Sequence, residues 1–158
     1  MNDNVEAEDL EPKADLTKKD LEAWIFNRCA RENLKLTAPR KTIIDVLISH
    51  QDHPDVEMIY QRASQQDAQI SIATVYRTVK SLEAIAVLLR HEFGDGRARY
   101  ELAIRQHHDH LIDIDSGEVI EFCDPAIEEL QDKIAKKLGY RLTGHRLDLY
   151  GKKLSSKP

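Results

Sequence analysis

The sequence is poor in cysteine and in aromatic residues, and it has no long apolar run. Its 158 residues include only two cysteines, Cys29 and Cys123, which stand far apart and form no CxxC pair. A disulfide framework and a four-cysteine zinc site within one chain are therefore excluded. No apolar run approaches the ~20 residues that a membrane span needs, and the N-terminal segment is acidic where a secretion signal would be basic and then apolar. We therefore expect no membrane association and a cytoplasmic location.

The sequence also lacks the positive charge that is typical of nucleic-acid-binding proteins. Its formal net charge is −5, but the first 20 residues hold seven acidic side chains against three lysines and so account for −4 of it. The rest of the chain is close to neutral, and a neutral average can still include a basic face. Charge alone therefore neither supports nor excludes DNA binding. With 41% hydrophobic and 32% charged residues, the composition is that of a globular protein of one or two small domains.

The first half of the chain has the pattern of a helical domain. Residues 1–18 are polar and acidic, and we expect them to form a mobile tail. Beyond the tail, apolar residues at helical spacing predict a helix from Leu21 and three more, each opened by an N-cap residue, namely Thr37, Asp55 and Ser71.

A hairpin is predicted after the fourth helix. Two strand-like runs, 87–93 and 98–102, flank the turn Gly94-Asp95-Gly96. Helices followed by such a hairpin are the elements of a winged helix-turn-helix domain, which we place at residues 19–103.

The second half, residues 104–158, changes to a β-rich pattern. Two strands are predicted at 107–114 and 118–122, a helix runs from Asp124-Pro125 to Leu138, and a final strand covers 141–150. The fold class is thus α+β, with a small α/β domain after the winged helix. Its expected core is thin, so we expect a homodimer to complete it. That core comprises Leu111, Ile112, Ile114, Val119, Ile120, Phe122, Ile127, Leu130, Ile134 and Leu138.

The densest cluster of potential ligands is the run His107-His108-Asp109-His110. On a strand, alternate side chains share a face, so His108 and His110 would face one side and His107 and Asp109 the other. One strand can thus supply two ligands to each of two metal ions. Imidazole and carboxylate donors without thiolate suit Fe(II), Mn(II), Zn(II) or Co(II). The alternative interpretation is a solvated histidine-rich edge with no ion.

The fourth helix has an apolar stripe formed by Ile72, Val75, Val79 and Leu82. Its other face offers Ala73, Thr74, Tyr76, Arg77 and Lys80 to an outside partner. Taken alone, this is the pattern of an ordinary surface helix. Its place between short helices and a Gly-Asp-Gly hairpin favours a DNA-recognition helix with a wing.

Six segments, in order, resemble the ferric uptake regulator family. They are Ile70–Arg77, Arg90–Gly96, Tyr100–Leu102, His107–Ile112, Gly117–Phe122 and Leu142–His145. The resemblance runs from about residue 24 to Tyr150. It implies a dimeric repressor that binds palindromic double-stranded operator DNA when loaded with a divalent metal ion.

The resemblance also implies roles for particular residues. It assigns one set of four to a regulatory metal site between the two domains, namely His53, Glu101, His108 and His110. A second set belongs to a site within the dimerisation domain, namely His107, Asp109, Glu128 and His145. Tyr76 and Arg77 match the family's recognition-helix contacts, and Lys35 matches a basic residue that reaches the minor groove.

One departure from the family pattern concerns a structural zinc. Many members hold this ion with two CxxC pairs, but here Asp113 and Ser116 stand at the first pair and the C-terminal segment has no cysteine. We therefore expect no four-cysteine structural zinc. Some bacterial members and manganese-responsive relatives share this loss, so the resemblance does not single out iron. The expected cofactor is Fe(II) or Mn(II), with Zn(II) as a further candidate.

The leading hypothesis is thus a metal-responsive repressor of metal-uptake genes. A second hypothesis, a hydrolytic metalloenzyme, requires an open coordination position and a general base. The sequence shows no dedicated nucleophile or phosphate loop, and both proposed sites already have four protein ligands. A third hypothesis, a metal-buffering protein, leaves Tyr76, Arg77 and the wing unexplained. We therefore predict that the chain is not an enzyme.

Overall fold

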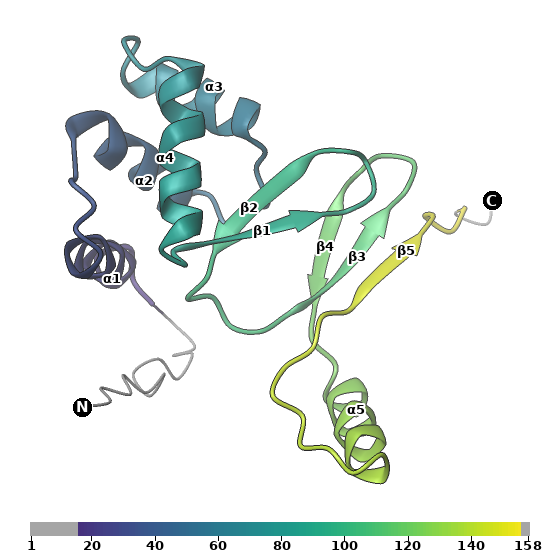
Figure 1. Cartoon of the computed structure of the whole chain (residues 1–158). Helices are drawn as coiled ribbons and strands as arrows, with labels where there is room; N and C mark the ends of the chain where they lie inside the picture. The colour runs from purple at the N-terminus through teal and green to yellow at the C-terminus, as the bar shows by residue number, and fades with distance from the viewer. Residues whose placement is uncertain (1–15, 156–158) are drawn as a thin grey trace, which may run out of the picture. The chain divides into compact units, whose positions relative to one another are not determined.

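The structure is a computed structural model that describes residues 16–155, and the chain divides into two compact units. Unit 1 extends to Gln106 and unit 2 begins at His107. Figure 1 shows helices and a hairpin in unit 1, and a three-stranded sheet with one helix in unit 2. The predicted acidic tail falls mainly on residues 1–15, which lie outside the described residues. No helix within residues 16–155 is long and apolar enough to span a membrane.

Unit 1 contains the four predicted helices. They are α1 (Lys18–Arg31), α2 (Ala38–Ser49), α3 (Val56–Gln66) and α4 (Ile72–Ala84). The side chains of Thr37, Asp55 and Ser71 accept hydrogen bonds from backbone N–H groups in the first turns of α2, α3 and α4. Each cap satisfies a donor that has no partner within its helix. The three predicted N-caps are confirmed.

Branched aliphatic side chains hold the helices of unit 1 together. α2 packs against α1, α3 and α4, and α3 also packs against α4. Among the buried side chains are Ile25 of α1, Ile43 of α2, Ile59 of α3 and Val75 of α4. Each contributes about 1.5–3 kcal/mol through burial. Ile72 was predicted to face this core but is exposed, because it is the first residue of α4 and precedes the turn that contacts the core.

A hairpin completes unit 1. β1 (Leu88–Glu92) pairs antiparallel with β2 (Ala98–Leu102), and Gly94 and Gly96 in the turn adopt positive φ angles of 86° and 75°, which favour glycine. The Tyr100 amide donates to the Pro54 carbonyl over 3.0 Å, which ties β2 to the loop before α3. Helices and hairpin together confirm the predicted winged helix-turn-helix.

Unit 2 is a three-stranded sheet with one helix. β3 (Asp109–Asp113) lies in the centre, antiparallel to β4 (Val119–Phe122) and parallel to β5 (Asp148–Gly151). α5 (Pro125–Lys137) connects β4 to the segment that leads into β5, and Gly139, at φ 86°, follows its C-cap as predicted. The α+β fold class is confirmed.

Two strands of unit 2 are shorter than predicted. β3 begins at Asp109 and not at residue 107, and β5 begins at Asp148 and not at residue 141. The two differences have one cause. Because β5 pairs only with β3 and runs parallel to it, residues before Leu147 lie beyond the first residue of β3 and have no neighbouring strand. The alternating pattern of 141–147 cannot form a ladder on its own.

The apolar side chains of unit 2 are mostly not buried within one chain. Of the ten predicted core residues, Ile112 alone is buried. On α5, which has no buried residue, Leu130 is 57% and Leu138 68% exposed. Apolar faces of this kind are typical of a surface that another chain covers.

Candidate metal centres and nucleic-acid interface

The run of four predicted ligands in residues 107–110 lies at the start of the central strand. His107 and His108 precede β3, and Asp109 and His110 are its first two residues. Their side chains still divide into two pairs. His107 Nε2 lies 3.4 Å from Asp109 Oδ1, and the rings of His108 and His110 are 4.9 Å apart. The alternation of the strand thus extends into the loop before it.

Four predicted ligands come together within unit 2, and we call them the unit 2 cluster: His107, Asp109, Glu128 and His145. One ligand atom from each lies within 4.8 Å of all the others. The two histidine Nε2 atoms are 2.8 Å apart. Asp109 Oδ1 lies 3.1 Å from His145 Nε2, and Glu128 Oε1 lies 3.3 Å from His107 Nε2 and 3.6 Å from His145 Nε2.

These distances fit a tetrahedral ion. Ligands ~2.0 Å from a tetrahedral Zn(II) are separated from each other by about 3.3 Å, and the five distances in the cluster run from 2.8 to 3.6 Å. In addition, Asp109 is 1% exposed and its Oδ2 has no hydrogen-bond partner. An uncompensated buried carboxylate oxygen is costly, and a divalent cation would compensate it.

The secondary structure around the unit 2 cluster explains its assembly. Asp124 caps α5 by accepting from the Ala126 amide over 2.8 Å, and Pro125 opens the helix, which places Glu128 in its first turn. Asp109 lies opposite Phe122 in the β3–β4 ladder. His145 comes from the irregular segment before β5, where the chain is free of a ladder and can turn its side chain toward Asp109.

Two ligands predicted for the regulatory site, His53 and Glu101, lie side by side in unit 1. His53 Nε2 is 3.1 Å from Glu101 Oε2, and both side chains are buried. The loop that carries His53 is held by Arg62, whose guanidinium donates to both carboxylate oxygens of Asp52, over 3.0 and 2.6 Å. Partial burial is the largest single effect and acts to raise the pKa of Asp52, but the hydrogen bonds and charge of Arg62, together with His50 and a backbone hydrogen bond, outweigh it, so the pKa is lowered.

A third buried residue, His91 of β1, was not predicted at this place. Its Nε2 lies 2.7 Å from Glu101 Oε1, and its ring stacks on Phe93 with 5.4 Å between centroids. The Glu101 carboxylate is thus held between His53 and His91. Predicting this contact requires the hairpin register, in which His91 pairs with Arg99 and so becomes a diagonal neighbour of Glu101.

The other two ligands predicted for the regulatory site, His108 and His110, lie in unit 2. His110 is buried, and the two rings are nearly perpendicular, at 84°. Sequence reasoning missed two carboxylates beside them. Glu121 Oε1 is 3.7 Å from His108 Nε2, and Asp148 Oδ1 is 3.2 Å from His110 Nδ1. Both residues lie opposite His110 in the sheet, Glu121 on β4 and Asp148 on β5. Their positions beside the histidines follow from strand register and cannot be predicted from residue spacing.

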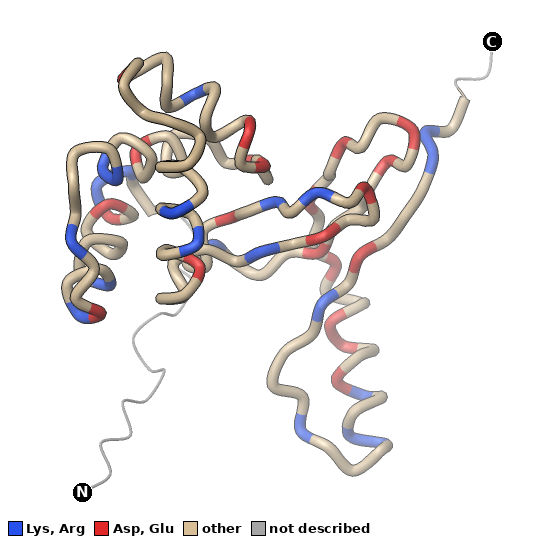
Figure 2. Tube along the Cα trace, turned by 45° about the horizontal axis from the view of Figure 1, so that its top comes forward, with Lys and Arg blue, Asp and Glu red and all other residues tan. Residues whose placement is uncertain are grey.

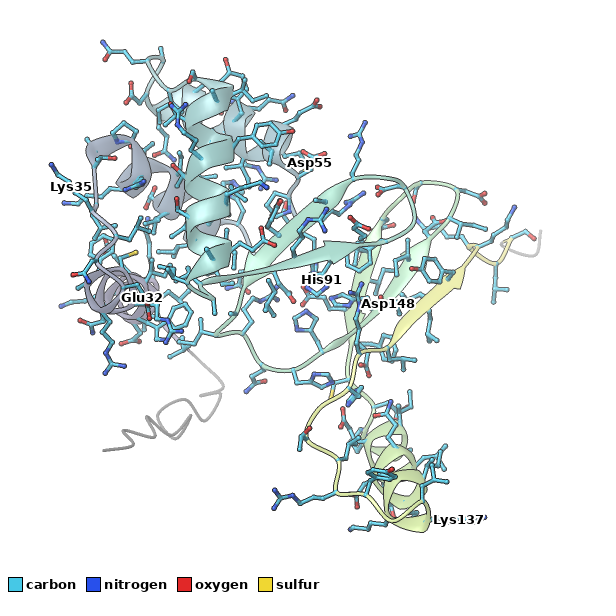
Figure 3. All side chains as sticks on the ribbon, viewed as in Figure 1. Glu32, Lys35, Asp55, His91, Lys137 and Asp148 are labelled. Carbon is cyan, nitrogen blue, oxygen red and sulfur yellow. The ribbon has the colours of Figure 1, made fainter. Side chains whose placement is uncertain are left out.

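The predicted DNA contacts lie on exposed surface of unit 1. On α4, Val75, Val79 and Leu82 are buried, whereas Tyr76 and Arg77 are exposed. Figure 2 shows basic residues along α4 and along the β1–β2 hairpin. Lys35, labelled in Figure 3, is exposed in the loop before α2, where its carbonyl accepts a 2.6 Å hydrogen bond from Arg40.

Asp113 and Ser116, which stand at the positions where the family resemblance implies a CxxC pair, form a hydrogen-bonded turn. Asp113 Oδ2 accepts from the Ser116 hydroxyl over 2.7 Å, and Asp113 Oδ1 accepts from the Asp115 amide over 3.0 Å. The Ser116 bond, followed by the Asp115 amide, holds the pKa of Asp113 below its ordinary value. The turn is therefore closed by hydrogen bonds of the protein itself.

Known proteins resemble this chain over most of its length. The sequence model of the ferric uptake regulator family matches residues 31–150. The ferric uptake regulation protein of Rhizobium leguminosarum bv. viciae is 50% identical over 132 residues, which cover 84% of this chain and 93% of the relative. Among solved structures, a zinc-bound manganese uptake regulator has 48% identity and a TM-score of 0.71, covering 82% of this chain and 98% of the other. The Vibrio cholerae ferric uptake regulator has 39% identity and a TM-score of 0.72, covering 80% and 98%.

Proposed function

The chain belongs to the ferric uptake regulator family, and on that premise we propose that it is a dimeric repressor that binds palindromic operators in the cytoplasm when loaded with Fe(II) or Mn(II). Regulators of this family respond to metal ions, control uptake genes, bind DNA and act as dimers; they are not enzymes. The hydrolytic hypothesis is thereby excluded. Repression, the palindromic operator and the roles of individual residues are the parts that we propose.

The regulatory site, in this proposal, takes ligands from both halves of the chain. His53 and Glu101 of unit 1 would bind the same ion as His108 and His110 of unit 2, with Glu121 as a further candidate ligand. Nitrogen and oxygen donors of this kind suit a divalent first-row ion. When bound, the ion supplies a positive charge that draws these donors together. If the DNA-binding arrangement binds the ion ten times more tightly, each site contributes ~1.4 kcal/mol toward that arrangement.

The unit 2 cluster is proposed as a second metal site of the same chain. The support for it is geometric and electrostatic, because four donors, Asp109 Oδ1 among them, stand at tetrahedral spacing, and the other oxygen of the buried Asp109 carboxylate, Oδ2, has no hydrogen-bond partner. This is the observation that carries the proposal of metal binding. His107 and Asp109 come from one end of β3, so an ion held here would fix α5 and the segment before β5 to the central strand.

Operator recognition is assigned to α4, with Tyr76 and Arg77 directed to the major groove and Lys35 to the minor groove. Support comes from their exposure and from the buried opposite face of α4. In a two-fold dimer, two copies of α4 would enter successive major grooves about 34 Å apart. An operator with two-fold symmetry matches that arrangement.

Which metal ion binds in the cell depends more on the availability of each ion there than on these donor atoms. Their affinities follow the Irving–Williams order, in which Zn(II) binds more tightly than Fe(II) or Mn(II). The relatives carry both iron and manganese in their names. We therefore propose Fe(II) or Mn(II) as the corepressor, with Zn(II) able to occupy the same ligands.

Metal stoichiometry tests the two-site proposal directly. The purified chain, loaded anaerobically with Mn(II) and freed of excess, should hold two ions per chain. Asp109→Ala and His110→Ala should each hold one, because each removes a ligand of a different site. Asp132→Ala, which removes an exposed carboxylate of α5, should still hold two. Equal stoichiometry in all four proteins would contradict the ligand assignment.

A further inference from the structure

Asp148, the first residue of β5, is directed at a ligand of the proposed regulatory site. In the parallel ladder it stands beside His110, and its Oδ1 lies 3.2 Å from His110 Nδ1. Both side chains are shielded, with 4% of His110 and 14% of Asp148 exposed. Figure 3 labels Asp148 at the start of β5.

A second residue holds the Asp148 carboxylate in place. Arg146 donates to Asp148 Oδ2 from Nε over 2.7 Å, and its Nη2 lies 2.7 Å from the same oxygen. Because the guanidinium occupies Oδ2, Oδ1 is the oxygen left to face His110. The backbone supports the same register, since the His110 amide donates to the Leu147 carbonyl over 3.1 Å.

The chemical consequence concerns the tautomer of His110. A neutral imidazole carries one N–H, and the nitrogen that has no hydrogen is the one that can bind a metal ion. A carboxylate beside Nδ1 accepts a hydrogen bond and so retains the hydrogen on Nδ1. The lone pair is then on Nε2. A hydrogen-bonded carboxylate also makes the imidazole a better electron donor and fixes the plane of its ring.

We propose that Asp148 is a positioning residue for metal binding: it holds His110 in the Nδ1–H tautomer and presents Nε2 as the ligand atom, while Arg146 fixes Asp148. This inference rests on the proposed role of His110 as a ligand. It assigns to β5 a part in metal affinity that neither the run of histidines nor the spacing of residues predicts. Partners of this type change metal affinity by about 10–100-fold when they are replaced.

The first test needs no substitution. Histidine ¹⁵N chemical shifts and long-range ¹⁵N–¹H couplings of the metal-free wild-type chain, recorded well above the imidazole pKa, report which ring nitrogen carries the hydrogen. His110 should be the Nδ1–H tautomer. A His110 ring protonated at Nε2 would overturn the proposal.

The second test is metal affinity of matched variants. His145→Ala, which breaks the unit 2 cluster, serves as the common background, so that one site titrates. In that background Asp148→Asn should weaken Co(II) binding about 10–100-fold and shift the visible spectrum of the bound ion. Asp132→Asn removes an equal charge from an exposed carboxylate that pairs with Lys136, and it should change neither.

The outcomes distinguish the positioning role of Asp148 from the ligand role of His110. If His110→Ala weakens Co(II) binding but Asp148→Asn stays within twofold of the background, the positioning role is wrong and the ligand role stands. If His110→Ala also has no effect, the ligand assignment fails and the positioning role fails with it. Arg146→Gln should weaken binding in the same direction as Asp148→Asn but less, because the carboxylate is still present.

Discussion

Glu101 shows at the scale of a single residue how a buried charge indicates function. Its carboxylate is buried between His53 and His91, at 3.1 and 2.7 Å, a costly place for an anion unless it has compensating partners. Glu101→Ala should therefore raise the metal concentration needed for DNA binding by at least about tenfold, or ~1.4 kcal/mol, and His110→Ala should do the same. Fluorescence anisotropy of labelled operator during a Mn(II) titration measures this.

The control for Glu101→Ala is Glu92→Ala, which removes an exposed carboxylate of the same hairpin that pairs with Arg90. It should leave the Mn(II) requirement unchanged. Size-exclusion chromatography should show dimers for all these variants, because the substitutions are on the β1–β2 hairpin and on β3 and none of them replaces an apolar residue of α5. A variant that loses the dimer and keeps a normal metal requirement would contradict the assignment.

Asp113 gives a residue-scale prediction about pH. The Ser116 hydroxyl, and then the Asp115 amide, hold the pKa of Asp113 below its ordinary 3.8. A carboxyl whose pKa is lower in the folded state contributes stability above its unfolded pKa, and that contribution is lost as pH falls through the folded pKa. Asp113→Ala should thus lower the thermal midpoint by a constant amount from pH 7 to about pH 4. The difference should shrink only below that range; a difference that vanished between pH 7 and 5 would refute this.

At the scale of elements, α4 carries the test of DNA recognition. Arg77→Ala should weaken operator binding by ~1–3 kcal/mol at every metal concentration if Arg77 contacts a base edge. Metal affinity should not change, because Arg77 belongs to neither ligand set. Lys133→Ala, which removes an exposed basic residue of α5, is the matched control. Operator affinity of Arg77→Ala equal to that of the control would exclude the recognition role.

The elements also show what the sequence predicts and what it does not. Helices of unit 1 were predictable because Thr37, Asp55 and Ser71 cap them and because their apolar residues recur at helical spacing. The length of β5 was not predictable, because a strand needs a partner strand and β3, the partner of β5, begins only at Asp109. For the same reason His91, Glu121 and Asp148 were missed: their places beside the predicted ligands depend on strand register. The two sets of four ligands came from family resemblance, supported for residues 107–110 by strand alternation.

At the scale of the whole molecule, the absence of a four-cysteine zinc site has a consequence for folding. The Asp113–Ser116 turn is closed by hydrogen bonds, and the exposed apolar residues of unit 2 are available to a second copy. Burial of these residues across the dimer, at ~25 cal/mol per Å², can then supply the folding free energy that metal binding supplies in zinc-dependent domains. After removal of metal with a chelator, the protein should be folded and dimeric by circular dichroism and sedimentation. An unfolded monomer that zinc restores would show that one of the ligand sets is structural.

In the proposed function, metal controls DNA binding by a protein that is already folded and dimeric. The most direct measurement is anaerobic anisotropy of an operator duplex with the chelated full-length chain, before and after addition of Mn(II) or Fe(II), at constant ionic strength. The expected result is weak binding without metal and at least about tenfold tighter binding with it, a difference of ~1.4 kcal/mol or more, with the dimer present throughout. Equal affinity for the operator in both states would show that metal does not control DNA binding by this protein.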